Sequence, residues 1–287
     1  MRFDVVVVLG MGRSGTSAMT RSLTALGVEL GKNTVAGDAN NHKGYFEDPE
    51  VVKINDIILE KMGSNWASLK FLGSEPLRGL HFKEERIKAE RWVKEMLSEG
   101  KPIGFKDPRL CRTLPFWQKV FEELGLRAGC LLIYRNPDEV AASLLARGDA
   151  SIDYARSLWC AYQVDALRHL QSEQWLAVKY NLMLMHPGRE LKRIAKFLGM
   201  AWDPHSSGVA EYSNQFLDSS LRHHQAKKGI RKSFNFPFML VTVMELVSRT
   251  RNDWCQWAAR AVAEQVFNKM KRDTAFSIPE NKATWAA

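Results

Sequence analysis

The chain has 287 residues, of which 45% are hydrophobic and 25% are charged. This composition is ordinary for a folded globular protein and excludes a disordered or fibrous chain. Forty-one Lys and Arg stand against 32 Asp and Glu, so the formal net charge is +9. A basic chain of this kind favours anionic partners such as nucleotides, nucleic acid, sulfated glycans or lipid headgroups.

The cysteines and the apolar segments indicate the compartment. Cys111, Cys130, Cys160 and Cys255 stand far apart without a C-x-x-C pair, so neither a zinc site nor a disulfide framework is predicted. The apolar run at residues 5–9 is too short for a signal peptide, and no stretch approaches the ~18 apolar residues of a membrane span. We therefore expect a soluble, cytoplasmic protein.

The first predicted elements are a strand, a glycine-rich turn and a helix. Residues 3–10, FDVVVVLG, contain a continuous run of β-branched valines and end at glycine, which predicts a parallel strand buried on both faces. Met19, Leu23 and Leu26 then recur at helical spacing, and Gly27 ends the helix. This order is typical of the opening of a nucleotide-binding α/β unit.

Further strands and helices alternate along the chain. Strands are predicted at residues 102–106, 128–135 and 174–180. Helices are predicted at residues 49–62, 82–98, 114–124, 137–147, 151–172 and 189–198. The alternation predicts an α/β fold with a three-layer, P-loop-like parallel sheet, flanked by helices through right-handed crossovers.

The last part of the chain has a different pattern. After Gly199 comes a stretch rich in Ser, His and Lys, and then a Trp-rich helical segment at about residues 238–272. We expect residues 1–200 to form a nucleotide-binding core and residues 201–287 a helical cap within the same single domain. The apolar helical face with Trp254 and Trp257 could dock onto the core, lie on a membrane surface or form a dimer contact. The sequence leaves the three open, and with them the oligomeric state.

The turn after the first strand is a candidate phosphate site. Residues 10–17, GMGRSGTS, have the G-x-x-x-x-G spacing of a P-loop, but Thr16 and Ser17 stand where a P-loop kinase carries Lys and then Ser or Thr. Backbone N–H groups at the start of the helix suit a phosphate, and Arg13 supplies a planar cation. The alternative is a glycine turn that only lets strand and helix pack. The missing lysine argues against ATP or GTP hydrolysis.

A second signal lies at the end of the third predicted strand. Arg135 ends the strand, Asn136 is an N-cap candidate, Pro137 stands in the first helical turn and Ser143 follows two turns later. Alone, this segment reads as an ordinary strand-to-helix corner. Together with the first loop, it resembles the 3'-phosphate-binding motif of sulfotransferases that use 3'-phosphoadenosine 5'-phosphosulfate (PAPS), and the two motifs stand in that family's order.

The resemblance implies roles for particular residues. The loop residues that would hold the 5'-phosphosulfate are Arg13, Ser14, Gly15, Thr16 and Ser17. Arg135 and Ser143 would hold the 3'-phosphate. Tyr180 matches a tyrosine that contacts adenine in the family, although a core tyrosine at a strand end explains it as well. Lys227, Lys228 and Gly229 resemble, more faintly, the loop that closes over the 3'-phosphate, with a solvated charge run as the alternative.

The catalytic residues are less clearly marked. Lys106, in a K-D-P-R element that resembles bacterial members of the family, is the candidate for a cation on the transferring group. Pro108 stands where small-molecule sulfotransferases carry a catalytic His. Other branches of the family carry a catalytic Glu in the segment after the first helix, and here Asp48, followed by Pro49, is predicted to be a helix N-cap. We therefore expect the general base to be Glu47, with His42 and Asp107 as weaker candidates. Glu47 could instead be a loop acid paired with a nearby lysine, and Asp107 a helix N-cap.

These residues predict a bacterial-type, cytoplasmic sulfotransferase. It would move a sulfuryl group from PAPS to a hydroxyl or amine of an acceptor such as a glycan, a lipid-linked sugar or a small metabolite. We expect no metal ion, because a sulfuryl group carries less charge than a phosphoryl group, and no nucleic-acid partner. Contact of the C-terminal helix with a membrane surface is compatible with this function. The alternatives are a P-loop kinase-like phosphotransferase and a non-catalytic nucleotide or polyanion binder.

Overall fold

The protein is built around one parallel sheet. The structure, a computed structural model, describes residues 2–31, 34, 37, 44–148, 150–170, 174–217, 235–249 and 253–272. The strands are β1 (Val5–Leu9), β2 (Ile103–Lys106), β3 (Ala128–Tyr134) and β4 (Trp175–Lys179). Their order across the sheet is β2-β1-β3-β4, and every neighbouring pair is parallel. All four predicted strands are confirmed.

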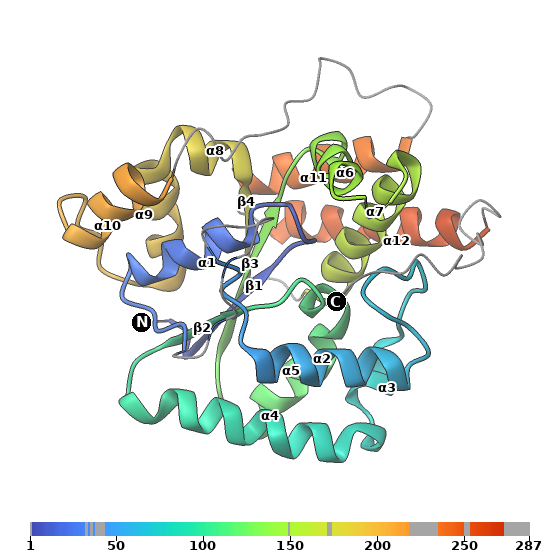
Figure 1. Cartoon of the computed structure of the whole chain (residues 1–287), viewed down its shortest axis with the longest axis horizontal. Coiled ribbons are helices and arrows are strands. Elements are labelled where there is room, and N and C mark those ends of the chain that lie inside the picture. The colour runs from blue at the N-terminus through green and yellow to red at the C-terminus, as the bar shows by residue number, and fades with distance from the viewer. Residues whose placement is uncertain are drawn as a thin grey trace.

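Helices follow the strands and cover both faces of the sheet (Figure 1). The first helices are α1 (Thr16–Thr24), α2 (Pro49–Lys61), α3 (Ser74–Arg78), α4 (Lys83–Met96), α5 (Leu110–Glu123) and α6 (Pro137–Ala146). The later ones are α7 (Ile152–His169), α8 (Tyr180–Met185), α9 (Pro187–Leu198), α10 (Ser207–Glu211), α11 (Asn235–Arg249) and α12 (Asp253–Arg272). The six helices predicted by residue range are confirmed, with small differences at their ends.

The largest such difference is at α5. The sequence prediction began this helix at residue 114, next to a proline, whereas the helix begins a full turn earlier, at Leu110, and contains Pro115. Leu110 and Cys111 are fully buried, and their packing favours the additional turn. The short helices α3, α8 and α10 were not predicted, because five or six residues are too few for a helical period to be recognised.

The two faces of the sheet bury separate hydrophobic cores. Side chains alternate along a strand, so Val5 and Val7 of β1 point into one core and Val6 and Val8 into the other. The first core is shared with α2, α4, α5, α6, α7, α11 and α12, and the second with α1, α8, α9 and α10. The predicted three-layer α/β architecture is therefore observed (Figure 1).

The C-terminal helices form the predicted cap. Helix α11 packs on β4 and α7, and α12 packs on α7 and α11. The side chain of Lys179, at the end of β4, pairs with Glu245 of α11. Trp254 and Trp257 do not dock onto the core as one alternative supposed, because they are 64% and 60% exposed. Among the described residues, no helix is long and apolar enough to cross a membrane.

Candidate functional site

The parallel sheet brings the predicted site residues to one edge. In a parallel sheet, the segments that follow the strands all lie at the carboxyl edge, which is where α/β proteins bind ligands. The glycine-rich loop follows β1, Lys106 ends β2, Arg135 follows β3 and Tyr180 follows β4. Four segments that are far apart in the sequence therefore meet at this edge.

The loop after β1 leads into a helix without a side-chain cap and holds the buried hydroxyl of Ser14. Gly15 precedes α1 in a left-handed conformation with φ of 93°, and no side-chain hydrogen bond caps the helix. The first N–H groups of a helix have no partner within the helix. Ser14 is fully buried, and among the described residues its Oγ has no hydrogen-bond partner. A bound anion at this position would meet both needs, so the loop fits a phosphate group.

Arg13 joins the loop to the second motif. It has a left-handed backbone with φ of 69°, and its Nε donates a 2.9 Å hydrogen bond to Oγ of Ser143 on α6. Nη1 of Arg135 also lies 3.4 Å from the carbonyl oxygen of Arg13. The two sequence motifs, about 120 residues apart, are therefore in direct contact.

Local sequence fixes the direction of α6. Asn136 caps this helix by accepting a 2.8 Å hydrogen bond from the Asp138 N–H, and Pro137 is its first residue. The predicted N-cap is thus confirmed. Arg135 precedes the cap, and its Nε donates a 2.7 Å bond to Oε2 of Glu139, one turn into the helix. Both side chains are buried, so Glu139 fixes the orientation of the guanidinium.

Tyr180 packs between the two motifs. The guanidinium carbon of Arg135 lies 5.0 Å from the centre of the Tyr180 ring, within the range of a cation–π contact. The same ring lies against Gly15, where an added Cβ would be 2.9 Å from Cγ of Tyr180 and closer still to Cδ2 and Cε2. Only glycine fits here, and Tyr180 borders the candidate phosphate site.

Lys106 and Glu47 form an ion pair beside the loop. Lys106 Nζ and Glu47 Oε1 are 2.5 Å apart, and both side chains are largely buried. Glu47 comes from the segment before α2, whose N-cap is Asp48 as predicted. Ser17 of α1 connects this segment to the loop, because its Oγ donates a 3.2 Å hydrogen bond to the Tyr45 carbonyl.

Burial decides the acidity of Glu47. Removal from water raises the pKa of its carboxyl above the ordinary value of 4.5, and the attraction of Lys106 offsets only part of this rise. A carboxyl with a raised pKa is better matched to proton transfer near neutral pH. This environment suits a general base.

Asp107 has a different environment. It is fully buried, and its Oδ2 accepts a 2.9 Å hydrogen bond from Nδ2 of Asn55. Its Oδ1 accepts from the backbone N–H and from Nη1 of Arg109. The side-chain oxygen of Asn55 in turn accepts hydrogen bonds from Thr113 and Trp117. The alternative of Asp107 as a helix N-cap is wrong, because the N-cap of α5 is Arg109 and no side-chain hydrogen bond caps that helix. Asp107 instead accepts hydrogen bonds in the turn before α5, with both oxygens in use.

Sequence reasoning missed some residues that shape the site. Glu139 could have been found, because it stands four residues after Arg135 on a predicted helix. Cys111 could not have been found, because it is 101 residues away from the group it contacts. Its buried Sγ accepts a 3.1 Å hydrogen bond from the backbone N–H of Gly10 at the start of the loop. Asn55 could not have been found either, because its partner Asp107 is 52 residues away. The predicted residues His42, Lys227, Lys228 and Gly229 lie outside the described residues.

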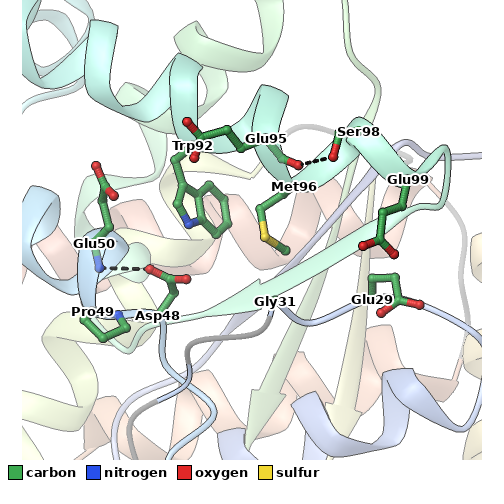
Figure 2. Close-up of a pocket in the computed structure, with 10 residues that line it drawn as sticks. All are labelled: Glu29, Gly31, Asp48, Pro49, Glu50, Trp92, Glu95, Met96, Ser98 and Glu99. Atoms are coloured by element: carbon green, nitrogen blue, oxygen red, sulfur yellow. Dashed lines mark hydrogen bonds between the residues drawn. The ribbon is translucent and has the colours of Figure 1, made fainter.

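Figure 2 shows a separate pocket, which Asp48 helps to line. Its volume is about 420 Å³, and its lining residues are Glu29, Gly31, Asp48, Pro49, Glu50, Trp92, Glu95, Met96, Ser98 and Glu99. Five of these carry carboxylates, and Asp48 is engaged with the Glu50 N–H. An acidic lining repels phosphate groups, so the carboxyl edge of the sheet is the better nucleotide site.

Comparison with known protein families decides the classification. The model of the sulfotransferase family matches residues 5–204, which is more than half of the chain. The chain belongs to the sulfotransferase family. Among curated proteins, no sequence matches it significantly.

Several solved sulfotransferase structures resemble the chain at low identity. The sulfotransferase domain of the Synechococcus PCC 7002 olefin synthase is 17% identical, with a TM-score of 0.45, and the match covers 92% of this chain and 94% of that one. The sulfotransferase domain of the curacin biosynthetic pathway is 13% identical, with a TM-score of 0.48 and coverages of 92% and 97%. Sulfotransferase STF1 of Mycobacterium tuberculosis H37Rv is 12% identical, with a TM-score of 0.40 and coverages of 78% and 74%.

The site of this sulfotransferase combines anion-binding groups with one carboxylate. The uncapped start of α1, Arg13 and Arg135 can bind phosphate groups. Lys106 and Glu47 form an ion pair at the same edge of the sheet. In the part of the chain that the structure describes, no group of three or more His, Cys, Asp or Glu is placed to hold a metal ion.

Proposed function

We propose that this sulfotransferase moves a sulfuryl group from PAPS to a hydroxyl or amine of an acceptor. The observation that carries the proposal is the contact between the two anion-binding motifs through Arg13, Ser143, Arg135 and Tyr180, next to the Lys106–Glu47 pair. A nucleotide with phosphates at both the 3' and the 5' position needs two anion sites. PAPS has this chemistry and supplies the sulfuryl group.

The residues of the loop would bind the 5' end of the donor. Ser14 Oγ, the open N–H groups at the start of α1 and Arg13 are the donors for the phosphosulfate, with Thr16 and Ser17 in the first turn. When the sulfur–oxygen bond breaks, negative charge develops on the departing phosphate. Hydrogen-bond donors that are already in position stabilise such charge without reorganisation.

Arg135 and Ser143 would bind the 3'-phosphate, with the Tyr180 ring beside the adenine. Glu139 holds Nε of Arg135, and Nη1 of the same guanidinium lies 3.4 Å from the carbonyl oxygen of Arg13 in the loop. Nε of Arg13 is held by Oγ of Ser143 at 2.9 Å. Arg135 is buried and Arg13 is half-buried, and arginines that neighbours already hold in place lose little freedom when a phosphate binds.

Glu47 would act as the general base and Lys106 as the cation at the transferring group. The acceptor oxygen or nitrogen forms a bond to sulfur, the bond from sulfur to the 5'-phosphate oxygen breaks, and the acceptor proton passes to Glu47. The raised pKa of Glu47 supports this role, and the two occupied oxygens of Asp107 make it the weaker candidate. Lys106, within 2.5 Å of Glu47, reaches the same region.

The cellular location and the domain organisation are further parts of the proposal. We propose a cytoplasmic location, which is supported by four buried cysteines that form no disulfide with one another. We also propose that residues 1–287 form a single domain, since α11 and α12 pack on β4 and α7 of the core. The acceptor belongs to the classes named above, namely a glycan, a lipid-linked sugar or a small metabolite.

Nucleotide binding tests the donor. Adenosine 3',5'-bisphosphate should raise the melting temperature, and ATP with Mg²⁺ should not. Arg135→Ala should weaken binding of the bisphosphate by about tenfold to a hundredfold, because hydrogen bonds to charged groups are lost. Arg127→Ala is the matched control, since Arg127 is exposed and lies just before β3, at the opposite edge of the sheet. A preference for ATP with Mg²⁺ would favour the kinase-like alternative and refute the proposal.

Transfer of labelled sulfate from PAPS to a panel of acceptors tests the base. Glu47→Gln should keep bisphosphate binding but slow transfer by about 10²-fold or more. Glu50→Gln, which changes an exposed acid one turn along the same segment, should transfer as the wild type does. Full turnover in Glu47→Gln would assign the base elsewhere.

A further inference from the structure

Helices α11 and α12 expose an unusual amount of apolar surface. The described residues expose eight large hydrophobic side chains, and four of them lie on these two helices: Phe238, Leu246, Trp254 and Trp257. Single exposed apolar residues need no explanation, but neighbouring ones indicate a contact surface. The two tryptophans stand three residues apart, so they share one face of α12.

Helix α12 is apolar on two opposite faces in its first half. Its core-facing side is formed by Cys255, Ala259 and Ala263, which are buried against α7 and α11. The other side carries Trp254 and Trp257 and continues through the half-buried Ala258 and Ala261. One apolar face is enough to dock a helix onto a core. The second face, defined here as the tryptophan face, has no such role in the fold.

The charges around the tryptophan face are mainly basic. Arg260 lies within the first half of α12, and Lys269, Lys271 and Arg272 form its last turn. The acids of the two helices are Asp253, the first residue of α12, and Glu245 and Glu264, which pair with Lys179 and Arg168 of the core. The whole chain carries a net charge of +9. The expected partner therefore has an apolar layer beneath a negative surface.

We propose that the tryptophan face docks onto the surface of an anionic lipid bilayer. Tryptophan is the side chain preferred at the boundary between headgroups and acyl chains, where its ring is buried and its N–H stays hydrated. Lysine and arginine next to such a face add attraction to anionic headgroups. The helix would lie in the plane of the membrane, beside the folded protein.

A second copy of the chain fits this face less well. Two tryptophan side chains exposed by about three fifths offer roughly 300 Å², whereas a stable dimer buries about 800 Å² on each partner. Two copies would also each bring a charge of +9 to the contact. The inference is independent of the sulfotransferase reaction, because it uses none of the site residues.

Flotation with vesicles tests the proposal. The full chain should float with vesicles that contain phosphatidylglycerol, less with vesicles of phosphatidylcholine alone, and less at high salt. The double variant Trp254→Ser and Trp257→Ser should bind anionic vesicles at least about tenfold more weakly than the wild type. The matched control is Leu80→Ser with Ile87→Ser, which removes two exposed apolar side chains elsewhere and should bind as the wild type does. Unchanged melting temperatures show that both variants are folded.

Depth of insertion gives a second measurement. Lipids with brominated acyl chains should quench the fluorescence of the wild type more than that of the double tryptophan variant. Equal flotation of that variant and the wild type would refute the proposal, and so would an absence of binding to anionic vesicles at low salt. Light scattering that shows a dimer in the wild type and a monomer in the variant would assign the face to a second copy instead.

Discussion

A single methyl group added at Gly15 should disrupt the candidate nucleotide site. Gly15 precedes α1 with φ of 93°, and the ring of Tyr180 packs directly on its Cα. The ring is buried, with the guanidinium of Arg135 5.0 Å from its centre. We predict that Gly15→Ala abolishes bisphosphate binding, because the ring must leave its place between the loop and Arg135.

The size of the effect follows from two contributions. A left-handed backbone costs a residue with a Cβ about 1–2 kcal/mol. The new Cβ would be 2.9 Å or less from three ring atoms, whereas carbon atoms normally pack about 3.5–4.0 Å apart. Overpacking of this kind in a buried place costs about 1–3 kcal/mol more. The variant should therefore lose about 2–5 kcal/mol of unfolding free energy.

Gly27→Ala is the matched control. Gly27 has φ of 81° in the turn after α1, and nothing lies within 4 Å of an added Cβ. It should lose only the backbone contribution of about 1–2 kcal/mol, a fall in melting temperature of roughly 2–8 °C. Urea unfolding and calorimetric titration of adenosine 3',5'-bisphosphate measure the two quantities for both variants. Equal stabilities in the two variants, or normal bisphosphate binding in Gly15→Ala, would refute the packing argument.

The other predictions concern buried polar groups. Burial, with a smaller repulsion from Arg168, lowers the pKa of His169 to about 3. The neutral imidazole therefore contributes stability that is fully present above the unfolded pKa of ~6.5 and is lost progressively as the pH falls below that value. Denaturant unfolding at about pH 5 should show a loss of about 2 kcal/mol in the wild type that His169→Gln lacks. Because burial raises the pKa of Glu47, the acid limb of the kcat/KM profile should have its midpoint above pH 4.5. Lys106→Met removes the attraction that favours the carboxylate, so it should move this midpoint to higher pH. An unchanged midpoint would contradict the ion pair. Cys111→Ala leaves the Gly10 N–H without its acceptor and should cost about 1–3 kcal/mol in urea unfolding, part of which Cys111→Ser restores; equal stability of Ala and Ser variants would show that the hydrogen bond contributes nothing.

The sequence by itself determined the elements and the motifs. Short apolar runs predict the buried parallel strands, and the helical spacing of apolar residues predicts most helices, because these signals are local. Asp48, Asn136 and the prolines after them mark the helix starts for the same reason. The order of the two phosphate motifs was also readable in the sequence, and the family match bears out the classification.

Only the tertiary structure decided which of these residues meet. The pairing of Lys106 with Glu47, the packing of Tyr180 on Gly15 and the contact of Cys111 with Gly10 join residues far apart in the sequence. The exposure of Trp254 and Trp257 is equally a tertiary result, since a helix with two apolar faces does not specify which one the core will cover. Such contacts depend on how helices pack across a sheet, and no local pattern records that geometry.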